Sequence, residues 1–260
     1  MTFSSLMGAA MPSQLTLAIH PQPDDITCGP TCLHAVYRYF GDDPALETVI
    51  REVQSLRSGG TLAVYLACHA LNRGYNATIY TYNLHMFDPS WFERRDPVRL
   101  ADKLKAQAAV KDNPRIRDAT AAYLEFLRLG GELRYQVVEA ELIRKYLRRG
   151  IPVLTGLSAT YLYQAARERP ADNAADDVRG EPAGHFVVLC GYDKENRAVL
   201  VADPYLQNPL GGGQYYTVPM TRLLGALLLG VLTHDANFLI IRPGAGRRPP
   251  FAAHSRLTVP

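Results

Sequence analysis

The chain has 260 residues, a formal net charge of +3, and 47% hydrophobic and 20% charged residues, which is ordinary for a globular protein. A chain of this length buries roughly 70–75% of its unfolded surface and needs neither disulfides nor a structural metal. Three arginines after residue 243 account for the whole positive excess (Arg247, Arg248, Arg256). Because no concentrated basic face remains, we expect no nucleic-acid partner.

The number of cysteines and the first residues of the chain indicate the cellular compartment in which we expect the protein. Four cysteines (Cys28, Cys32, Cys68, Cys190) are too few for a disulfide scaffold and favour free thiols in a reducing environment. The first residues lack the basic and sustained apolar regions of a secretory signal, and no apolar run reaches the 18 residues of a membrane span. We expect a cytoplasmic protein without membrane insertion. The sequence does not indicate its oligomeric state.

The first part of the chain is predicted to be mainly helical. Weak alternation after an irregular start predicts a short strand over 15–19. Pro30 suits the first turn of a helix, and apolar residues then recur every three or four positions up to Phe40, so a helix is predicted to begin at or just after Cys28. The same criteria predict helices over 45–56 and 62–74, with a helix-starting turn at 58–61, and a strand over 76–82.

The remaining pattern predicts a helical insertion followed by a sheet. Residues 83–131 are expected to insert two helices, 101–110 and 115–129, into a single domain spanning 1–243. The elements predicted after them are strand 133–138, helix 139–149, strand 152–157, helix 161–167, polar loop 169–183, strands 185–192, 198–203 and 214–218, helix 220–229, strand 237–241 and a flexible tail over 244–260. Helices followed by an antiparallel sheet indicate an α+β fold.

Cys28 is the candidate nucleophile. It lies at the predicted helix start, where the helix dipole and free amide groups lower the pKa of a thiol. The alternatives are a buried cysteine, a Cys28–Cys32 disulfide, and a zinc site that uses Cys28, Cys32 and His34. The zinc site lacks a second ligand pair at the usual spacing. The other three cysteines lie in apolar periodic runs and are predicted core residues. We therefore expect neither a metal nor a cofactor.

His185 and Asp203 are the candidate base and its orienting carboxylate. His185 begins a predicted buried strand after a polar loop, which gives it both access and rigidity. Asp203 ends the next strand, so pairing as a hairpin would make the two residues neighbours and let the carboxylate hold the imidazole. Asp193 is a rival acid at the far end of that strand. His20 and His34, the latter expected to face outward, are weaker rivals for the base.

Gln22 completes the candidate site. Its side-chain N–H and the backbone N–H of Cys28 can form a two-donor oxyanion hole. A glutamine between Pro21 and Pro23 can also be an ordinary loop residue. Both readings stay open at this point.

Taken in chain order, four segments resemble the papain-like cysteine peptidases, and most closely the C39 (bacteriocin-processing-like) family. They are Gln22, Cys28-Gly29-Pro30-Thr31, Gly184-His185-Phe186-Val187-Val188 and Asp203-Pro204. The resemblance implies a papain-like fold in which the nucleophile helix packs on the antiparallel sheet that carries His185. It also implies Cys28 as nucleophile, His185 as base, Asp203 as orienter and Gln22 as oxyanion donor. The best-known C39 domains are fused to membrane exporters and trim double-glycine leader peptides. Since this sequence shows neither a transmembrane nor an ATP-binding motif, their substrate does not carry over.

These observations predict a cysteine peptidase or amidohydrolase that cleaves a peptide or protein substrate through an acyl-enzyme. An acyl-enzyme that is resolved by an amine or a thiol would instead make a transferase or peptide ligase. An inactive papain-like module that binds peptides, and a metal-binding module, are the alternatives from other classes.

Overall fold

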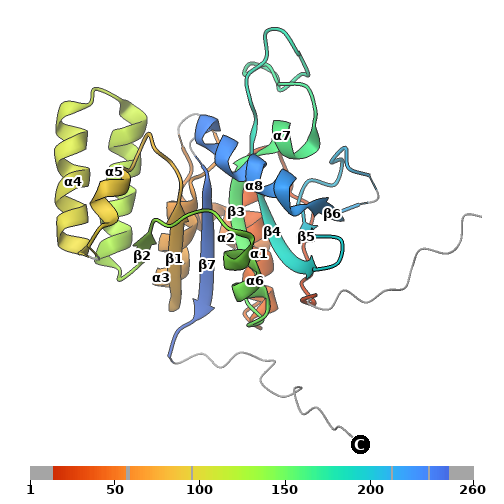
Figure 1. Cartoon of the computed structure of the whole chain (residues 1–260), viewed down its shortest axis with the longest axis horizontal. Coiled ribbons are helices and arrows are strands. Elements are labelled where there is room, and N and C mark those ends of the chain that lie inside the picture. Colours follow the sequence, from red (N-terminus) through yellow and green to blue (C-terminus); the bar gives the residue numbers. More distant parts are fainter. Residues whose placement is uncertain (1–13, 57–58, 95, 212, 234, 246–260) are drawn as a thin grey trace, which may run out of the picture.

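The structure is a computed structural model that describes residues 14–245 apart from 57–58, 95, 212 and 234. Its described strands form a single sheet in the order β2-β1-β7-β3-β4-β5-β6 (Figure 1). The strands are β1 (Tyr75–Thr81), β2 (Glu132–Arg134), β3 (Val153–Ser158), β4 (Gly184–Asp193), β5 (Ala198–Ala202), β6 (Tyr215–Pro219) and β7 (Asn237–Pro243).

Helices cover both faces of this sheet. They are α1 (Cys28–Tyr39), α2 (Leu46–Glu52), α3 (Ala63–Asn72), α4 (Pro97–Val110), α5 (Pro114–Arg128), α6 (Ala140–Leu147), α7 (Ala159–Tyr163) and α8 (Met220–Leu229), with 3-10 turns η1 (Pro89–Phe92) and η2 (Gly230–Thr233). One buried cluster joins α1, α3 and α5 to one face of the sheet. A second cluster joins α6 and α8 to the other face. Alternate residues of the central strands supply the two clusters, as the two-residue period of a strand requires.

The predicted α+β class, with the helix that begins at Cys28 packed on a mostly antiparallel sheet, is confirmed. The expected separation of helices from strands along the chain is wrong in one respect. Strands β1 and β2, from the first half, belong to the same sheet, where β1 pairs with β7 in antiparallel and with β2 in parallel. β1 is buried along most of its length, and such a strand needs partners on both edges to satisfy its backbone groups.

Helix α1 begins at Cys28, as predicted, and ends before Gly41, whose φ of 77° suits glycine. It packs against β4, which is buried from His185 to Tyr192. The thiol of Cys32 donates to the carbonyl of Phe186 at 3.2 Å. The start of α1 is thereby fixed beside the first residues of β4.

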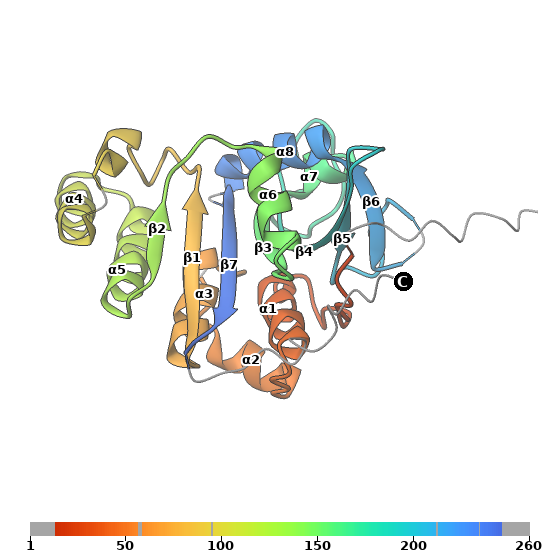
Figure 2. The same ribbon diagram turned by 60° about the horizontal axis from the view of Figure 1, so that its bottom comes forward.

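The predicted insertion contains the two expected helices, α4 and α5. Each begins at a side-chain cap, because Asp96 and Asn113 accept hydrogen bonds from the first backbone N–H groups. The two helices lie together beyond the edge strand β2 in both views (Figure 1, Figure 2). Helix α5 packs on α3 and contributes Tyr123 and Phe126 to the same buried cluster as α1. The assignment of one domain over 1–243 stays a prediction.

Three local predictions are wrong. Residues 15–19 form no strand, because their polar groups bond elsewhere: the Leu15 N–H donates to Cys190, and the Leu17 carbonyl accepts from the Tyr215 hydroxyl. Strand β2 ends at Arg134, and helix α7 covers 159–163 rather than 161–167, ending where Gln164 adopts a φ of 55°. Predictions for residues 1–13, 58 and 246–260 fall outside the described part of the chain. None of the described helices combines the length and apolar character needed to cross a bilayer.

Candidate active site

A cavity of about 660 Å³ lies where β4 and β7 begin. Its lining includes Cys28 at the start of α1 and His185 near the start of β4. The segment between α7 and β4, which projects from this end of the sheet (Figure 1), contributes Pro170, Glu181 and Pro182. Helix α5 from the insertion forms another part of the wall. The predicted nucleophile and base therefore share one cavity, although 157 positions separate them in the sequence.

Cys28 is the first residue of α1, and its side chain is a free thiol with 9% of its surface exposed. The first N–H groups of a helix have no partner within the helix, so this end attracts negative charge. The next residue, Gly29, lies against Thr61 and Phe186: a Cβ there would be 2.5 Å from Thr61 Cγ2. Close packing therefore holds the thiol at the cavity wall.

His185 Nε2 and Asp203 Oδ1 are 2.8 Å apart. Strands β4 and β5 form the predicted antiparallel hairpin, with a bulge between Leu189 and Gly191. Continuing the register from the pair Val188–Ala202 sets Asp203 diagonally across from His185 on the same side of the sheet. Because Asp203 occupies Nε2, the other ring nitrogen of His185, Nδ1, is left for the cavity. Asp193 lies at the far end of the hairpin and caps its turn.

The electrostatic surroundings favour a charged His185. Burial lowers the pKa of His185, but the charge of Asp203, the charge of Cys28 and hydrogen bonds with both outweigh it and raise the pKa to about 10. Burial acts against the charged form of Asp203 too, yet His185 and hydroxyl donors lower its pKa. The pair is therefore an imidazolium and a carboxylate at neutral pH.

Two tyrosines that the sequence analysis missed hold Asp203 in place. The hydroxyls of Tyr163 and Tyr216 donate to Asp203 Oδ2 at 2.7 and 2.5 Å, and the Tyr205 N–H donates to Oδ1 at 2.8 Å. Burial and the charge of Asp203 raise the pKa of both tyrosines, so they remain donors. The alternating burial of β6 marks Tyr216 as inward-facing. The sequence offers no comparable signal for Tyr163.

Comparison with known proteins gives the family. The model of the Peptidase_C39 like family matches residues 11–225, which is most of the chain. The protein belongs to the C39-like peptidase family. A comparison with curated proteins gave no match.

Solved peptidase structures resemble this C39-like protein at low identity. A double-glycine-motif protease from an AMS/PCAT transporter, solved with a leader peptide, is 16% identical, with 89% of this chain and 95% of that chain covered and a TM-score of 0.42. The peptidase domain of Streptococcus ComA is 11% identical (88% and 99% covered, TM-score 0.42). Xylellain, a cysteine protease from Xylella fastidiosa, is 14% identical (90% and 87% covered, TM-score 0.40).

Gln22 of this C39-like chain lies beside the Asp203 segment. Its backbone N–H donates to the Pro204 carbonyl at 2.9 Å, and its side-chain Nε2 donates to the Asp24 carbonyl at 2.8 Å. An amide nitrogen carries two hydrogens, so one donor is left after the bond to Asp24. The side chain of Gln22 is not part of the cavity lining, whereas Asp25 and Ile26 are. Its role as an oxyanion donor stays a prediction.

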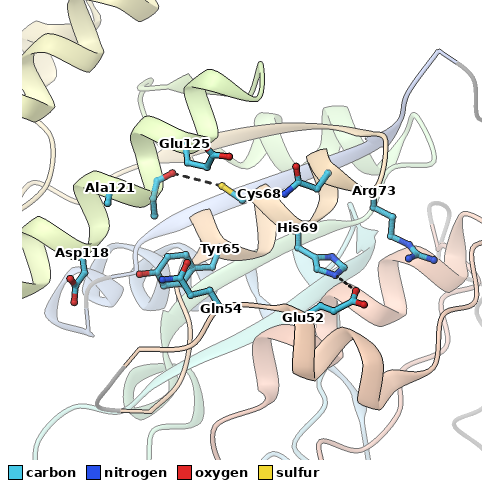
Figure 3. A pocket seen from close by; sticks show the side chains of 11 residues that line it. Glu52, Gln54, Tyr65, Cys68, His69, Arg73, Asp118, Ala121 and Glu125 are labelled. Atoms are coloured by element: carbon cyan, nitrogen blue, oxygen red, sulfur yellow. Dashed lines mark hydrogen bonds and ion pairs between the residues drawn. The ribbon is translucent and has the colours of Figure 1, made fainter.

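A second cavity, of about 560 Å³, is also lined by a cysteine and a histidine, Cys68 and His69, which are consecutive in the sequence (Figure 3). Figure 3 shows the two side chains engaged with different partners. Cys68 donates to the Ala122 carbonyl at 3.7 Å, and burial, aided by the charge of Glu125, raises its pKa to about 12. The ring nitrogens of His69 contact Tyr37 and Glu52. This cavity holds no activated thiol.

The other histidines and cysteines that the sequence analysis considered contact neighbouring protein groups or are buried in the core. His34 is buried rather than outward-facing, because its Nε2 contacts the Pro44 carbonyl at 3.1 Å. Exposed His20 is paired with Arg38. Cys32 and Cys190 are buried core residues. The structure records all four cysteines as free, so the alternative of a Cys28–Cys32 disulfide is not realised.

Proposed function

We propose that this C39-like protein is a cysteine peptidase that hydrolyses a peptide bond through Cys28, His185 and Asp203. The observation that supports this most directly is the 2.8 Å contact between His185 and Asp203, together with Cys28 in the same cavity. The four residues named by the sequence comprise a complete set for covalent catalysis: a nucleophile, a base, an orienter and an oxyanion donor.

In the proposed reaction, the proton of the Cys28 thiol already resides on His185, as the imidazolium described above, and the Cys28 sulfur attacks the carbonyl carbon of the substrate. The carbonyl π electrons move to oxygen, where the Cys28 backbone N–H and the second N–H of Gln22 stabilise the charge. Collapse of this intermediate expels the amine, which receives the proton from His185. Water then attacks the thioester, with His185 as base, and releases the acid and the free thiol.

The shape of the cavity supports an extended peptide as the substrate. The lining includes Ile26 and the turn at Gly59 and Gly60 from the first part of the chain, and Glu181 and Pro182 from the segment before β4. Backbone groups in such turns can pair with an extended chain, while alternate side chains enter pockets. The 83–131 segment contributes Ile116 and other residues of α5 to the wall, so we assign to it a part in shaping the substrate cleft.

The test is selective alkylation. Iodoacetamide near pH 7 is expected to label Cys28 in the folded wild-type protein, and to label it much more slowly in His185→Ala. Cys68 and Cys190 serve as internal controls, since burial raises the pKa of each to about 12. Equal, slow labelling of Cys28 in both proteins would refute the Cys28–His185 pair. Mass spectrometry of products formed with and without an added amine then separates hydrolysis from ligation, the alternative outcome for the same acyl-enzyme.

A further inference from the structure

A buried carboxyl group with no role in the proposed catalysis faces the active-site cavity. Asp235 lines the same cavity as Cys28 and His185, and only 6% of its surface is exposed. Its Oδ1 has no hydrogen-bond partner among the described residues. Two residues further on, Asn237 is 3% exposed and also lines the cavity. Its Oδ1 likewise has no hydrogen-bond partner among the described residues. The lining of this cavity therefore contains two buried hydrogen-bond acceptors that have no donor.

The backbone turns both acceptors toward the same side. Asn237 is the first residue of β7, and both Asn237 and Asp235 line the cavity. Ala236, between them, points to the opposite face, where it belongs to the cluster of α6 and α8. Ala236 also has a φ of 61°, which is a costly conformation for a residue with a side chain. Ala236 packs on the side of α6 and α8, whereas Asp235 lies against Gly156 and lines the cavity together with Tyr123 of α5.

Two glycines leave the space that the carboxyl group occupies. A Cβ at Gly156 of β3 would lie 2.8 Å from the Cγ and Oδ1 of Asp235. A Cβ at Gly184, next to His185, would lie 2.9 Å from Thr233 and 3.3 Å from Asp235 Oδ2. The carboxyl group is therefore packed against the backbone of β3 and β4, beside the predicted base. Asp25, another acid in the cavity lining, is exposed to solvent and is not enclosed in this way.

An uncompensated acceptor in this position is expensive, which suggests that a ligand supplies the donor. A buried acceptor without a partner loses the hydrogen bonds that it makes to water in the unfolded chain, and the loss is larger when the group is charged. Burial raises the pKa of Asp235 well above its usual range, and the charge of His185 only partly opposes this. A cationic ligand group would restore the charged form and pair with it.

Apolar side chains in the lining of the same cavity suit a long aliphatic stem. Met86, Ile116, Ala119 and Tyr123 all line the cavity. Tyr123 and Asp235 line the same cavity, and the charge of Asp235 contributes, after burial, to raising the pKa of Tyr123. Lys and Arg side chains bury their methylene groups against apolar surface and carry the charge at the tip, and the face of a tyrosine ring attracts such a cation.

We propose that Asp235 and Asn237 form the end of a specificity pocket that accepts a lysine or arginine side chain of the peptide substrate. This inference rests on the proposed function for its substrate, but the pocket itself can be tested without turnover. Asp235 is a binding residue in this proposal, and it takes no part in bond cleavage.

The first experiment profiles cleavage sites. The full-length wild-type protein is incubated with a proteome digested by chymotrypsin, which keeps lysine and arginine inside the peptides, and new termini are read by mass spectrometry. Lysine or arginine is expected at one fixed position relative to the cut. Asp235→Asn, which keeps the size of the side chain, should lower that preference about tenfold or more, with Cys28 alkylation unchanged. Asp25→Asn, a matched loss of one acid in the same cavity, should keep the preference.

The second experiment separates a failed pocket from a failed function. Butylguanidine and its neutral analogue butylurea are titrated into Cys28→Ala protein, and binding is followed by NMR. The guanidine should bind about tenfold more tightly than the urea, and the difference should vanish in Cys28→Ala/Asp235→Asn. Discrimination without any peptide cleavage would remove the proposed function and keep the pocket. Cleavage with no basic preference and equal binding of the two probes would overturn the pocket and keep the function. Loss of the preference in Asp25→Asn, but not in Asp235→Asn, would overturn it as well.

Discussion

His185 and Asp203 lie on consecutive strands, and the antiparallel pairing of β4 with β5 brings Nε2 of the first within 2.8 Å of Oδ1 of the second. Asp203 is fully buried, so its charge depends on the donors around it. His185, two tyrosine hydroxyls and one backbone N–H provide these donors. A buried carboxylate satisfied in this way holds a neighbouring imidazole in one orientation.

Asp203→Asn should disable this arrangement while preserving its shape. An amide in place of the carboxylate removes the negative charge that holds His185 protonated, so we expect kcat/KM for peptide cleavage to fall about 10²- to 10⁴-fold. Asp193→Asn, at the other end of the same hairpin, is the matched control and should retain wild-type rates. Similar rates in the two variants would show that Asp203 does not orient the base.

Tyr216→Phe should destabilise the fold through Asp203. The change leaves Oδ2 with one donor fewer, at an expected cost of about 1.5–3 kcal/mol in the free energy of unfolding, measured with urea. The pKa of Asp203 should rise, which moves the midpoint of acid unfolding to higher pH. Tyr215→Phe is the neighbouring control: its hydroxyl bonds the Leu17 and Ile19 backbone, so it should cost about 1 kcal/mol and leave the acid midpoint near that of the wild type. Equal acid midpoints for the two variants would contradict the role of Tyr216.

Stability should decrease on both sides of a range from about pH 4 to 6.5, near the ordinary pKa values of aspartate and histidine. His185 has a raised pKa of about 10, so its contribution is complete below pH 6.5 and is lost as the pH rises toward 10. Asp203 has a lowered pKa, so its contribution is complete above its unfolded value and is lost in acid. The alkaline loss can reach about 1.4 kcal/mol per pH unit. Urea unfolding at pH 6, 8 and 10 measures it. His185→Gln should flatten the alkaline limb, whereas exposed His20→Gln should leave it unchanged.

Gly29→Ala should displace the neighbouring Cys28, because the new Cβ would lie 2.5 Å from Thr61 Cγ2. We expect a loss of about 1–3 kcal/mol in stability and slower alkylation of Cys28. Adding Thr61→Ser removes that methyl group and keeps the hydroxyl bond to the Gln54 carbonyl, so the double variant should recover much of the loss. Additive effects of the two changes would mean that this contact does not position Cys28.

Local sequence signals were sufficient for the elements that carry the site. Pro30 and the apolar spacing after it place Cys28 at the start of α1. The two apolar runs around a turn at 193–196 predict a hairpin, and the hairpin makes His185 and Asp203 neighbours. Each signal acts within about twenty residues, where helix and strand periods determine which side chains share a face.

Contacts between distant segments were decided only by the tertiary structure. The periodicity of β1 does not indicate that β7 is its partner. No local pattern predicts that Tyr163 of α7 contacts Asp203. Asp235 follows the same rule: its setting depends on glycines in β3 and β4. The sequence by itself determined that Cys28 lies at the start of its helix and His185 near the start of its strand. The tertiary structure decided what surrounds them, because pairing and packing between remote segments depend on the shape of the whole core rather than on local residue spacing.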